Sequence, residues 1–305
     1  MPSAGTHPKA AHEVQHDPPA RVRTLFISDV HLGTRACQAE LLTNFLRRHE
    51  PNAIFLIGDI AEGWRLTSDR PWAQSHIAVV AELLRRARAG TKVVYVPGNH
   101  DELMRRCAGL SFAGIEVALH AIHEAADGRR YLLTHGDQFD AVLAHAPWLA
   151  TVGHHAYHLL LGVNTAVNAA RRRLGLNYWS LAGWAKQNVK RVVSYVSAFE
   201  ECLSAEARRH GAHGVICGHI HRAADREVLG IRYLNTGDWV ESCSAIVEHN
   251  DGRLEVVQWR TPWEWSAQRG TWDSSRLVSR NENAALDVFR DFQLRIRSAF
   301  HRRAG

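Results

Sequence analysis

Five apolar, β-prone segments of the chain each end in side chains that can bind a metal ion. The first, Thr24 to Ser28, continues into Asp29-Val30-His31, where a carboxylate and an imidazole are two positions apart. A single Asp-x-His is weak evidence, because one pair does not make a closed set of ligands. Open α/β sheets nevertheless bind ligands beyond the carboxyl ends of their strands. The same arrangement at other strand ends would supply the missing ligands.

The pattern recurs after four more apolar segments, at 53–57, 92–96, 130–134 and 214–217. These segments continue into Gly58-Asp59, Pro97-Gly98-Asn99-His100-Asp101, His135-Gly136-Asp137 and Gly218-His219-Ile220-His221, respectively. Repetition at five strand ends favours one shared metal site over five unrelated turns.

The predicted ligands are oxygen and nitrogen donors without a thiolate: Asp29, His31, Asp59, Asn99, His135, His219 and His221. Such a set suits two first-row dications, Mn²⁺ above all with Fe²⁺ or Zn²⁺ as alternatives, better than a structural zinc site. We expect Asp59 to bridge, because it is central in the order of ligands. Two ions about 3.5–4 Å apart activate a water and stabilise charge on a phosphoryl oxygen during in-line displacement.

His100 directly follows one predicted ligand and precedes Asp101. We predict that His100 is a general acid that donates to the phosphoryl or the leaving oxygen, with Asp101 fixing its tautomer. The alternative is a neutral surface imidazole with no catalytic role.

The elements around these motifs predict a layered α/β fold. Strands and amphipathic helices alternate from residue 22 to 101, with helices expected at 36–49, ended by Pro51, and at 77–88. Shorter strands are expected at 114–119, 121–124 and 131–134, with Asp127-Gly128 as a hairpin turn. Further hairpins are expected across Gly230 and across 250–252, with strands at 227–229, 231–235, 244–249 and 253–259.

The chain divides into a core with an inserted segment. We expect a disordered lead-in at 1–20, a core at 21–138 and 211–260, a helical insertion at 139–210, and a helical tail at 261–305. The insertion combines apolar residues with basic ones such as Arg171, Arg172 and Arg173. It is either a helical hairpin packed on the core or an amphipathic cap that holds an apolar ligand tail and touches membrane lipid.

Composition limits the classes of partner. Lys and Arg number 37 against 31 Asp and Glu, a net charge of +6, which favours anionic partners such as phosphates or acidic headgroups. There is no run of five or six basic residues, so nucleic acid is not expected.

The five scattered cysteines indicate a reducing compartment. With no signal peptide and no apolar run of about 18 residues, we expect a soluble, cytoplasmic protein, with contact at the inner face of the membrane as an option.

In order and spacing, the motifs resemble the signature of the calcineurin-like metallophosphoesterase superfamily over about residues 22 to 260. The matching motifs are Asp29-x-His31, Gly58-Asp59, Gly98-Asn99-His100-Asp101, His135 and Gly218-His219-x-His221. This resemblance implies a double β-sheet sandwich flanked by helices. It implies one metal ion held by Asp29, His31, Asp59 and His221, and a second held by Asp59, Asn99, His135 and His219.

Three further features resemble the UDP-2,3-diacylglucosamine pyrophosphohydrolases of lipid A synthesis: residues 58–64, the Thr134-His135-Gly136-Asp137 motif, and the insertion between His135 and His219. The resemblance implies cleavage of a pyrophosphate into UMP and a diacylglucosamine 1-phosphate, with the acyl chains under the helical cap. The best-known branch has Arg after the Asn ligand, whereas this chain has His100, so it resembles a paralogous branch with Gly-Asn-His-Asp. Trp64, Lys186 and Lys190 are expected at the substrate.

Two other functions remain open. One is a phosphodiesterase or phosphatase that acts on a soluble phosphoester, with a purely structural insertion. The other is a non-catalytic scaffold that keeps the fold for protein binding, against which the intact ligand set argues, because buried His and Asp without a ligand are costly to keep.

Overall fold

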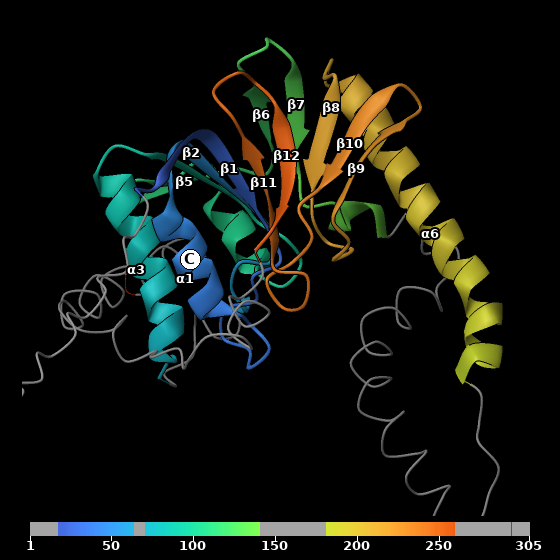
Figure 1. Ribbon diagram of the computed structural model, residues 1–305, viewed down its shortest axis with the longest axis horizontal. Helices are drawn as coiled ribbons and strands as arrows, with labels where there is room; N and C mark the ends of the chain where they lie inside the picture. The colour runs from blue at the N-terminus through green and yellow to red at the C-terminus, as the bar shows by residue number, and fades with distance from the viewer. Residues whose placement is uncertain (1–17, 64–70, 141–180, 260–293, 295–305) are drawn as a thin grey trace, which may run out of the picture.

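Two β-sheets stacked face to face form the centre of the molecule, with helices on both outer faces (Figure 1). The computed structural model describes residues 18–63, 71–140, 181–259 and 294, and it describes the side chains of α6 only from Tyr195 onward. Most of the expected lead-in, insertion and tail, with Trp64, therefore lies outside the described residues, as do the side chains of Lys186 and Lys190.

The larger sheet has seven strands in the order β12-β11-β1-β2-β3-β5-β4. They are β1 (Ala20–Ile27), β2 (His49–Ile57), β3 (Lys92–Val96), β4 (Ser111–Phe112), β5 (Ile115–Val117), β11 (Ser244–Glu248) and β12 (Leu254–Gln258). β1, β2 and β3 are parallel neighbours, so their carboxyl ends reach the same edge of the sheet.

The smaller sheet has five strands in the order β6-β7-β8-β10-β9. They are β6 (Ala121–Glu124), β7 (Arg130–Leu133), β8 (Gly214–Cys217), β9 (Ala224–Val228) and β10 (Ile231–Asn235). β7 and β8 are parallel and bring the remaining site motifs to one edge.

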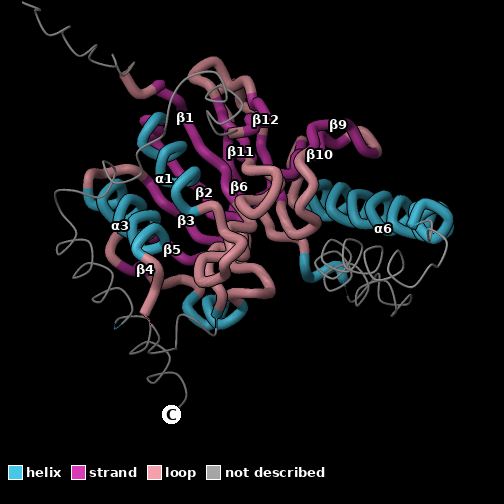
Figure 2. Tube along the Cα trace, turned by 60° about the horizontal axis from the view of Figure 1, so that its bottom comes forward, coloured by secondary structure: helices cyan, strands magenta, loops and turns pink. Residues whose placement is uncertain are grey.

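Helices cover the two outer faces. α1 (Ala39–Arg48) and α3 (Gln74–Arg88) pack on the larger sheet, and α6 (Leu181–Arg209) packs on the smaller one. Figure 2 shows α6 continuing past the edge of the smaller sheet. Two short 3₁₀ helices, η1 (Glu102–Cys107) and η2 (Asp137–Phe139), follow the site motifs. Among the described residues no helix is long and apolar enough to span a bilayer.

Successive side chains along a strand point to opposite faces of the sheet, and this alternation explains how the hydrophobic core divides into layers. Phe26 of β1 faces the cluster between the sheets, whereas its neighbours Leu25 and Ile27 belong to the cluster under α1 and α3. Tyr131 and Leu132 of β7 divide in the same way between the inter-sheet cluster and the cluster under α6. Both faces of each sheet are thus buried, which is why the central strands are almost continuously apolar.

One polar group connects the two sheets inside this apolar layer. Glu248 of β11 is fully buried, and its carboxylate lies 2.7 Å from Nε2 of His123 on β6 and 3.1 Å from Nε of Arg23 on β1. The His123 ring lies edge-on to the stacked rings of Phe26 and Phe55. This carboxylate is therefore shared by strands of both sheets.

The double-sheet sandwich and the expected hairpins are confirmed, and the differences are local. The first helix begins at Ala39 and ends at Arg48, so Pro51 does not end it but lies in β2, opposite Val22. The strand expected at 114–119 is only Ile115–Val117, and it pairs with the unexpected β4 across the turn at Ala113-Gly114. Of residues 139–210, the expected helical insertion, the structure describes 139–140 and 181–210, which include α6, and the division of the chain into core and insertion stays a prediction.

Candidate metal centre

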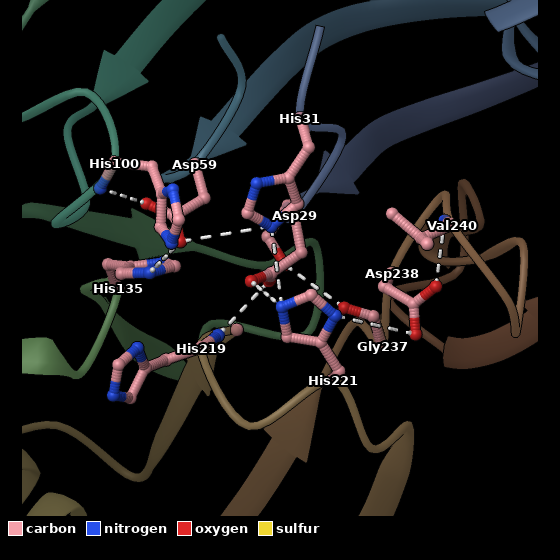
Figure 3. Close-up of polar contacts among 12 residues, drawn as sticks. Asp29, His31, Asp59, His100, His135, His219, His221, Gly237, Asp238 and Val240 are labelled. Atoms are coloured by element: carbon pink, nitrogen blue, oxygen red, sulfur yellow. Dashed lines mark hydrogen bonds and ion pairs between the residues drawn. The ribbon is translucent and has the colours of Figure 1, made fainter. Parts of the chain in front are cut away.

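The strand-end motifs from both sheets converge at one edge of the sandwich (Figure 3). β1 is followed by Asp29 and His31, β2 by Asp59, β7 by His135, and β8 by His219 and His221. Their side chains form three overlapping groups with ligand atoms within 4.8 Å of one another: Asp29, His31 and His221; His31, Asp59 and His100; and Asp59, His135 and His219. All the predicted Asp and His ligands are therefore brought together.

Asp59 lies at the middle of this cluster. Its Oδ2 atom is 3.3 Å from Nε2 of His135 and 3.9 Å from Nε2 of His31. On the far side of His31, Nε2 of that ring is 3.4 Å from Nε2 of His221, which is itself 3.2 Å from Oδ1 of Asp29. The Asp59 carboxylate thus lies between the side chains on the β1 side of the cluster and those on the β7 side.

Two buried atoms of the cluster have no hydrogen-bond partner, namely Oδ1 of Asp29 and Nε2 of His135. His135 donates from Nδ1 to the carbonyl of Ile57 at 2.9 Å, which leaves Nε2 as the nitrogen with a lone pair. Buried polar atoms are nearly always paired, so a carboxylate oxygen and an imidazole nitrogen that accept no hydrogen bond in one cluster fit a cation. The residues present therefore match the chemistry of a metal site.

The backbone of the site is held in an uncommon conformation. Asp29, His31, Asp59, His219 and His221 all have positive φ, between 51° and 72°. Each such residue costs about 1–3 kcal/mol, and such residues cluster at functional sites. Asp and His tolerate this region better than most residues. The left-handed turn lets two ligands two positions apart face the same space.

Three glycines make room for the ligands. A Cβ added at Gly58 would overlap the ring of His135, and one at Gly218 would overlap the carboxylate of Asp29 and Oγ of Ser28. A Cβ at Gly98 would overlap Oδ1 of Asp59 and come within 2.6 Å of Cδ2 of His135. The glycines of the motifs are thus required by the close approach of the backbone to the side chains of the cluster.

Asp59 and His135 stabilise each other's charged forms. Burial alone would raise the pKa of Asp59, but the neighbouring His135, His31 and His100 lower it below its usual range. Burial alone would lower the pKa of His135, but Asp59 and Asp29 raise it above its usual range. The anionic carboxylates at the centre therefore favour a positive charge there.

Glu62, three residues after Asp59, contacts two histidines of the site. Its carboxylate lies 3.0 Å from Nδ1 of His31 and 3.1 Å from Nδ1 of His100. Burial would raise the pKa of Glu62, but hydrogen bonds from His100 and His31 lower it to about 2. The bond to Glu62 is in turn the largest cause of the raised pKa of His100. An ionised Glu62 thus orients His100 and favours its protonated form.

The prediction that Asp101 fixes the tautomer of His100 is wrong. Asp101 is fully buried, and its carboxylate accepts from the backbone N–H of Ile60 at 2.7 Å and of Gly98 at 2.5 Å, and from the Tyr95 hydroxyl. These bonds hold the loop that carries Asn99 and His100, so Asp101 shapes the site through the backbone. A carboxylate adjacent in sequence was the obvious partner, but the turn directs it into the core.

Asn99 lies in this loop between Gly98 and His100, whose backbone N–H donates to Oδ1 of Asp59 at 2.9 Å. The Asn99 side chain is exposed, and its role as a ligand stays a prediction.

Sequence reasoning missed Glu62, Asp140 and Asp238. Glu62 belongs to the Gly58-Asp59-Ile60-Ala61-Glu62 motif, and its spacing from Asp59 was the available clue. Asp140 contacts His219, and Oδ2 of Asp238 lies 3.9 Å from Nδ1 of His221. Asp140 lies 79 positions from His219, and Asp238 lies 17 positions from His221. Neither contact could therefore be predicted from a local sequence motif.

Comparison with known proteins agrees with this geometry. The family model described as calcineurin-like phosphoesterase matches residues 22–223. The chain is 28% identical over 243 residues to a UDP-2,3-diacylglucosamine hydrolase of Aeromonas salmonicida, covering 76% of this chain and 92% of that protein. It is 28% identical to a protein of that name from Xanthomonas campestris pv. campestris (75% and 96% covered) and 26% identical to one from Salmonella arizonae (67% and 84% covered). The expectation of a metallophosphoesterase-type hydrolase is thereby confirmed, and the chain belongs to the calcineurin-like phosphoesterase family.

Proposed function

We propose that this enzyme hydrolyses the pyrophosphate bond of a lipid-linked nucleotide of the UDP-2,3-diacylglucosamine type, with UMP and a lipid phosphate as products. The relatives that bear this name share about three quarters of the chain with it. The same site could cleave a soluble phosphoester, and the experiment below separates the two substrates.

The central position of Asp59 is the observation that carries the proposal of two cations. Because Asp59 lies between His31 and His135, each of which has a second group of donors beside it, one carboxylate can serve two ions. Asp29, His31, Asp59 and His221 would hold one ion, and Asp59, Asn99, His135 and His219 the other. The oxygen and nitrogen donors favour Mn²⁺ or Fe²⁺, with Zn²⁺ as an alternative.

Bound there, two dications would supply Lewis acidity to a phosphoryl group and lower the pKa of a water. The chain itself supplies the proton for the leaving group. Nδ1 of His100 is bonded to Glu62, so Nε2 is the nitrogen that can carry a transferable proton to the leaving oxygen. The hydrogen bond with Glu62 raises the pKa of His100 and so favours its protonated form.

The helical insertion is the proposed binding region for the acyl chains. α6 brings the chain back to the core and packs on the outer face of the smaller sheet. Trp64, Lys186 and Lys190 are proposed to contact the substrate, and Arg171 to Arg173 an anionic membrane surface at the cytoplasmic face. Flotation with anionic liposomes tests the membrane contact, since protein that stays at the bottom of the gradient does not bind.

The decisive experiment is phosphorus NMR of UDP-2,3-diacylglucosamine incubated with Mn²⁺-loaded protein, beside the Asp59→Ala variant and the deacylated substrate. Release of UMP from the acylated substrate by wild type alone supports the proposal. Equal cleavage of acylated and deacylated substrates would favour the soluble-substrate alternative. A folded protein that binds no cation and cleaves no phosphoester would favour the scaffold.

A further inference from the structure

His219 is held from outside the cluster by a carboxylate at the start of the helical insertion. Its Nε2 lies 2.8 Å from Oδ2 of Asp140, the last described residue before residue 181. The other oxygen of Asp140 accepts a hydrogen bond of 2.7 Å from the hydroxyl of Tyr195 on α6. A side chain from the start of the insertion and one from the middle of α6 thus meet behind one predicted metal ligand.

α6 also packs directly on the His219 ring. Tyr195 and Phe199 are one helical turn apart, so they share a face of α6, and their rings stack at 6.3 Å. Phe199 is fully buried, and its ring lies 5.8 Å from the ring of His219, which lies 5.2 Å from His135 on another side. Gly136 permits this packing, because a Cβ there would come within 2.6 Å of Phe199.

The contact with Asp140 decides which nitrogen of His219 can bind a cation. A carboxylate acceptor at Nε2 places the ring proton on that atom and leaves the lone pair on Nδ1. Figure 3 shows one ring nitrogen of His219 on the side of His135 and the other directed away from the cluster. The backbone N–H of His219 donates to Oδ2 of Asp29 at 3.0 Å, which fixes the position from which the ring extends.

We propose that Asp140 and Tyr195 are positioning residues of the metal centre, which hold His219 with Nδ1 as its ligand atom and thereby link the helical insertion to cation affinity. The inference rests on the two-cation centre proposed above. Because the insertion contributes the two residues behind His219, a displacement of α6 that separates Tyr195 from Asp140 weakens the site on the His135 side. The site formed by Asp29, His31 and His221 is not touched by this contact.

The test is calorimetric titration of the cation-free full chain with Mn²⁺ alone, for wild type and for Asp140→Ala, Asp140→Asn and Tyr195→Phe. We expect Asp140→Ala to lower the affinity of one of the two sites by about 10–100-fold and leave the other unchanged. Asp140→Asn keeps an acceptor for the Nε2 proton and should recover part of the loss. Tyr195→Phe removes only one hydroxyl and should give a smaller loss at the same site.

A second readout separates orientation from stability. Long-range proton–nitrogen NMR of the Zn²⁺-loaded protein should show His219 protonated at Nε2 in wild type and a changed tautomer or mixed state in Asp140→Ala. Asp225→Ala is the matched control, because Asp225 pairs with Arg232 on the same sheet away from the cluster. It should leave both the isotherm and the His219 resonances unchanged.

The outcomes are distinct. If wild type binds two Mn²⁺ ions and Asp140→Ala binds them with the same affinities, the positioning role is refuted while the two-cation centre stands. If wild type binds no second ion, the two-cation centre of the proposed function is wrong, and the positioning role that rests on it falls with it. If Asp140→Asn is as defective as Asp140→Ala, with His219 still protonated at Nε2 in both, Asp140 is itself a ligand and the positioning role is wrong.

Discussion

Glu62 and His100 form a carboxylate–imidazole pair at the edge of the cluster, with Nδ1 of His100 3.1 Å from the Glu62 carboxylate. The same carboxylate reaches Nδ1 of His31, so one residue orients a predicted ligand and the predicted general acid together. Glu62 should therefore affect both cation binding and proton transfer, and the pH dependence distinguishes the two effects.

Replacing Glu62 by Gln should move the basic limb of the kcat profile to lower pH. The ionised carboxylate raises the pKa of His100, so its loss lowers that pKa, and the acid form disappears at a lower pH. The measurement is kcat against pH at saturating Mn²⁺. Glu102→Gln, an exposed glutamate just after the same loop, is the control and should leave the profile in place. An unmoved basic limb in Glu62→Gln would contradict the role given to His100.

His100→Asn should lower kcat by about 10²–10⁴-fold for a substrate with a poor leaving group, because the proton donor is lost. The deficit should shrink for bis(p-nitrophenyl) phosphate, whose leaving group departs as a stable anion and needs no proton. His120→Asn is the control, since His120 is exposed and outside the cluster. Equal losses on both substrates would mean that His100 acts on binding or on the cations instead of on the leaving group.

Gly98→Ala should weaken cation binding, because its Cβ would overlap Asp59 and press on His135. The added methyl should cost about 1–3 kcal/mol of folding free energy and lower cation affinity by at least about tenfold. Gly109→Ala is a useful comparison, because Gly109 has a φ of +81° but no atom within 4 Å of an added Cβ. That variant should cost about 1–2 kcal/mol through backbone strain alone and bind Mn²⁺ normally.

The cluster of Asp and His side chains could be predicted from sequence because its members follow the ends of β1, β2, β7 and β8. Parallel neighbours bring Asp29 and Asp59 to one edge of the larger sheet, and His135 and His219 to one edge of the smaller sheet, whatever the details of packing. The meeting of these two edges depends on the stacking of the sheets. The partners that orient the ligands could not be predicted in this way. Glu62 meets His100 across 38 positions, beyond the neighbouring strands β2 and β3, and Asp140 meets His219 across 79, beyond β7 and β8. The directions of these side chains in the loops after the strands do not follow from the order of the strands.

Asp101 illustrates the opposite error, in which proximity in sequence suggested a contact that the backbone prevents. The turn at Gly98-Asn99 directs the Asp101 carboxylate toward Ile60 and Tyr95, in the core, while His100 faces the cluster. The positive φ angles of the predicted ligands could not be predicted from the sequence either, because neither composition nor periodicity specifies backbone angles.

Glu248 should make folding stability depend on acid pH, since it is the carboxylate that joins the two sheets. Hydrogen bonds from His123, Thr24 and Ala126 outweigh burial and hold its pKa below the ordinary 4.5. The folded state therefore binds this proton less tightly than the unfolded state, so the stabilisation is present above about pH 4.5 and is lost as pH falls through the folded pKa. Glu248→Gln should cost about 1–3 kcal/mol at pH 7, because the uncharged amide offers one acceptor oxygen where the carboxylate offers two to His123, Arg23 and the Ala126 N–H, and the difference from wild type should narrow at lower pH. Guanidinium unfolding of the EDTA-treated protein at pH 7 and pH 4 measures both, with the exposed Glu255→Gln as control. A difference that stays constant between the two pH values would show that Glu248 acts through packing and not through its charge.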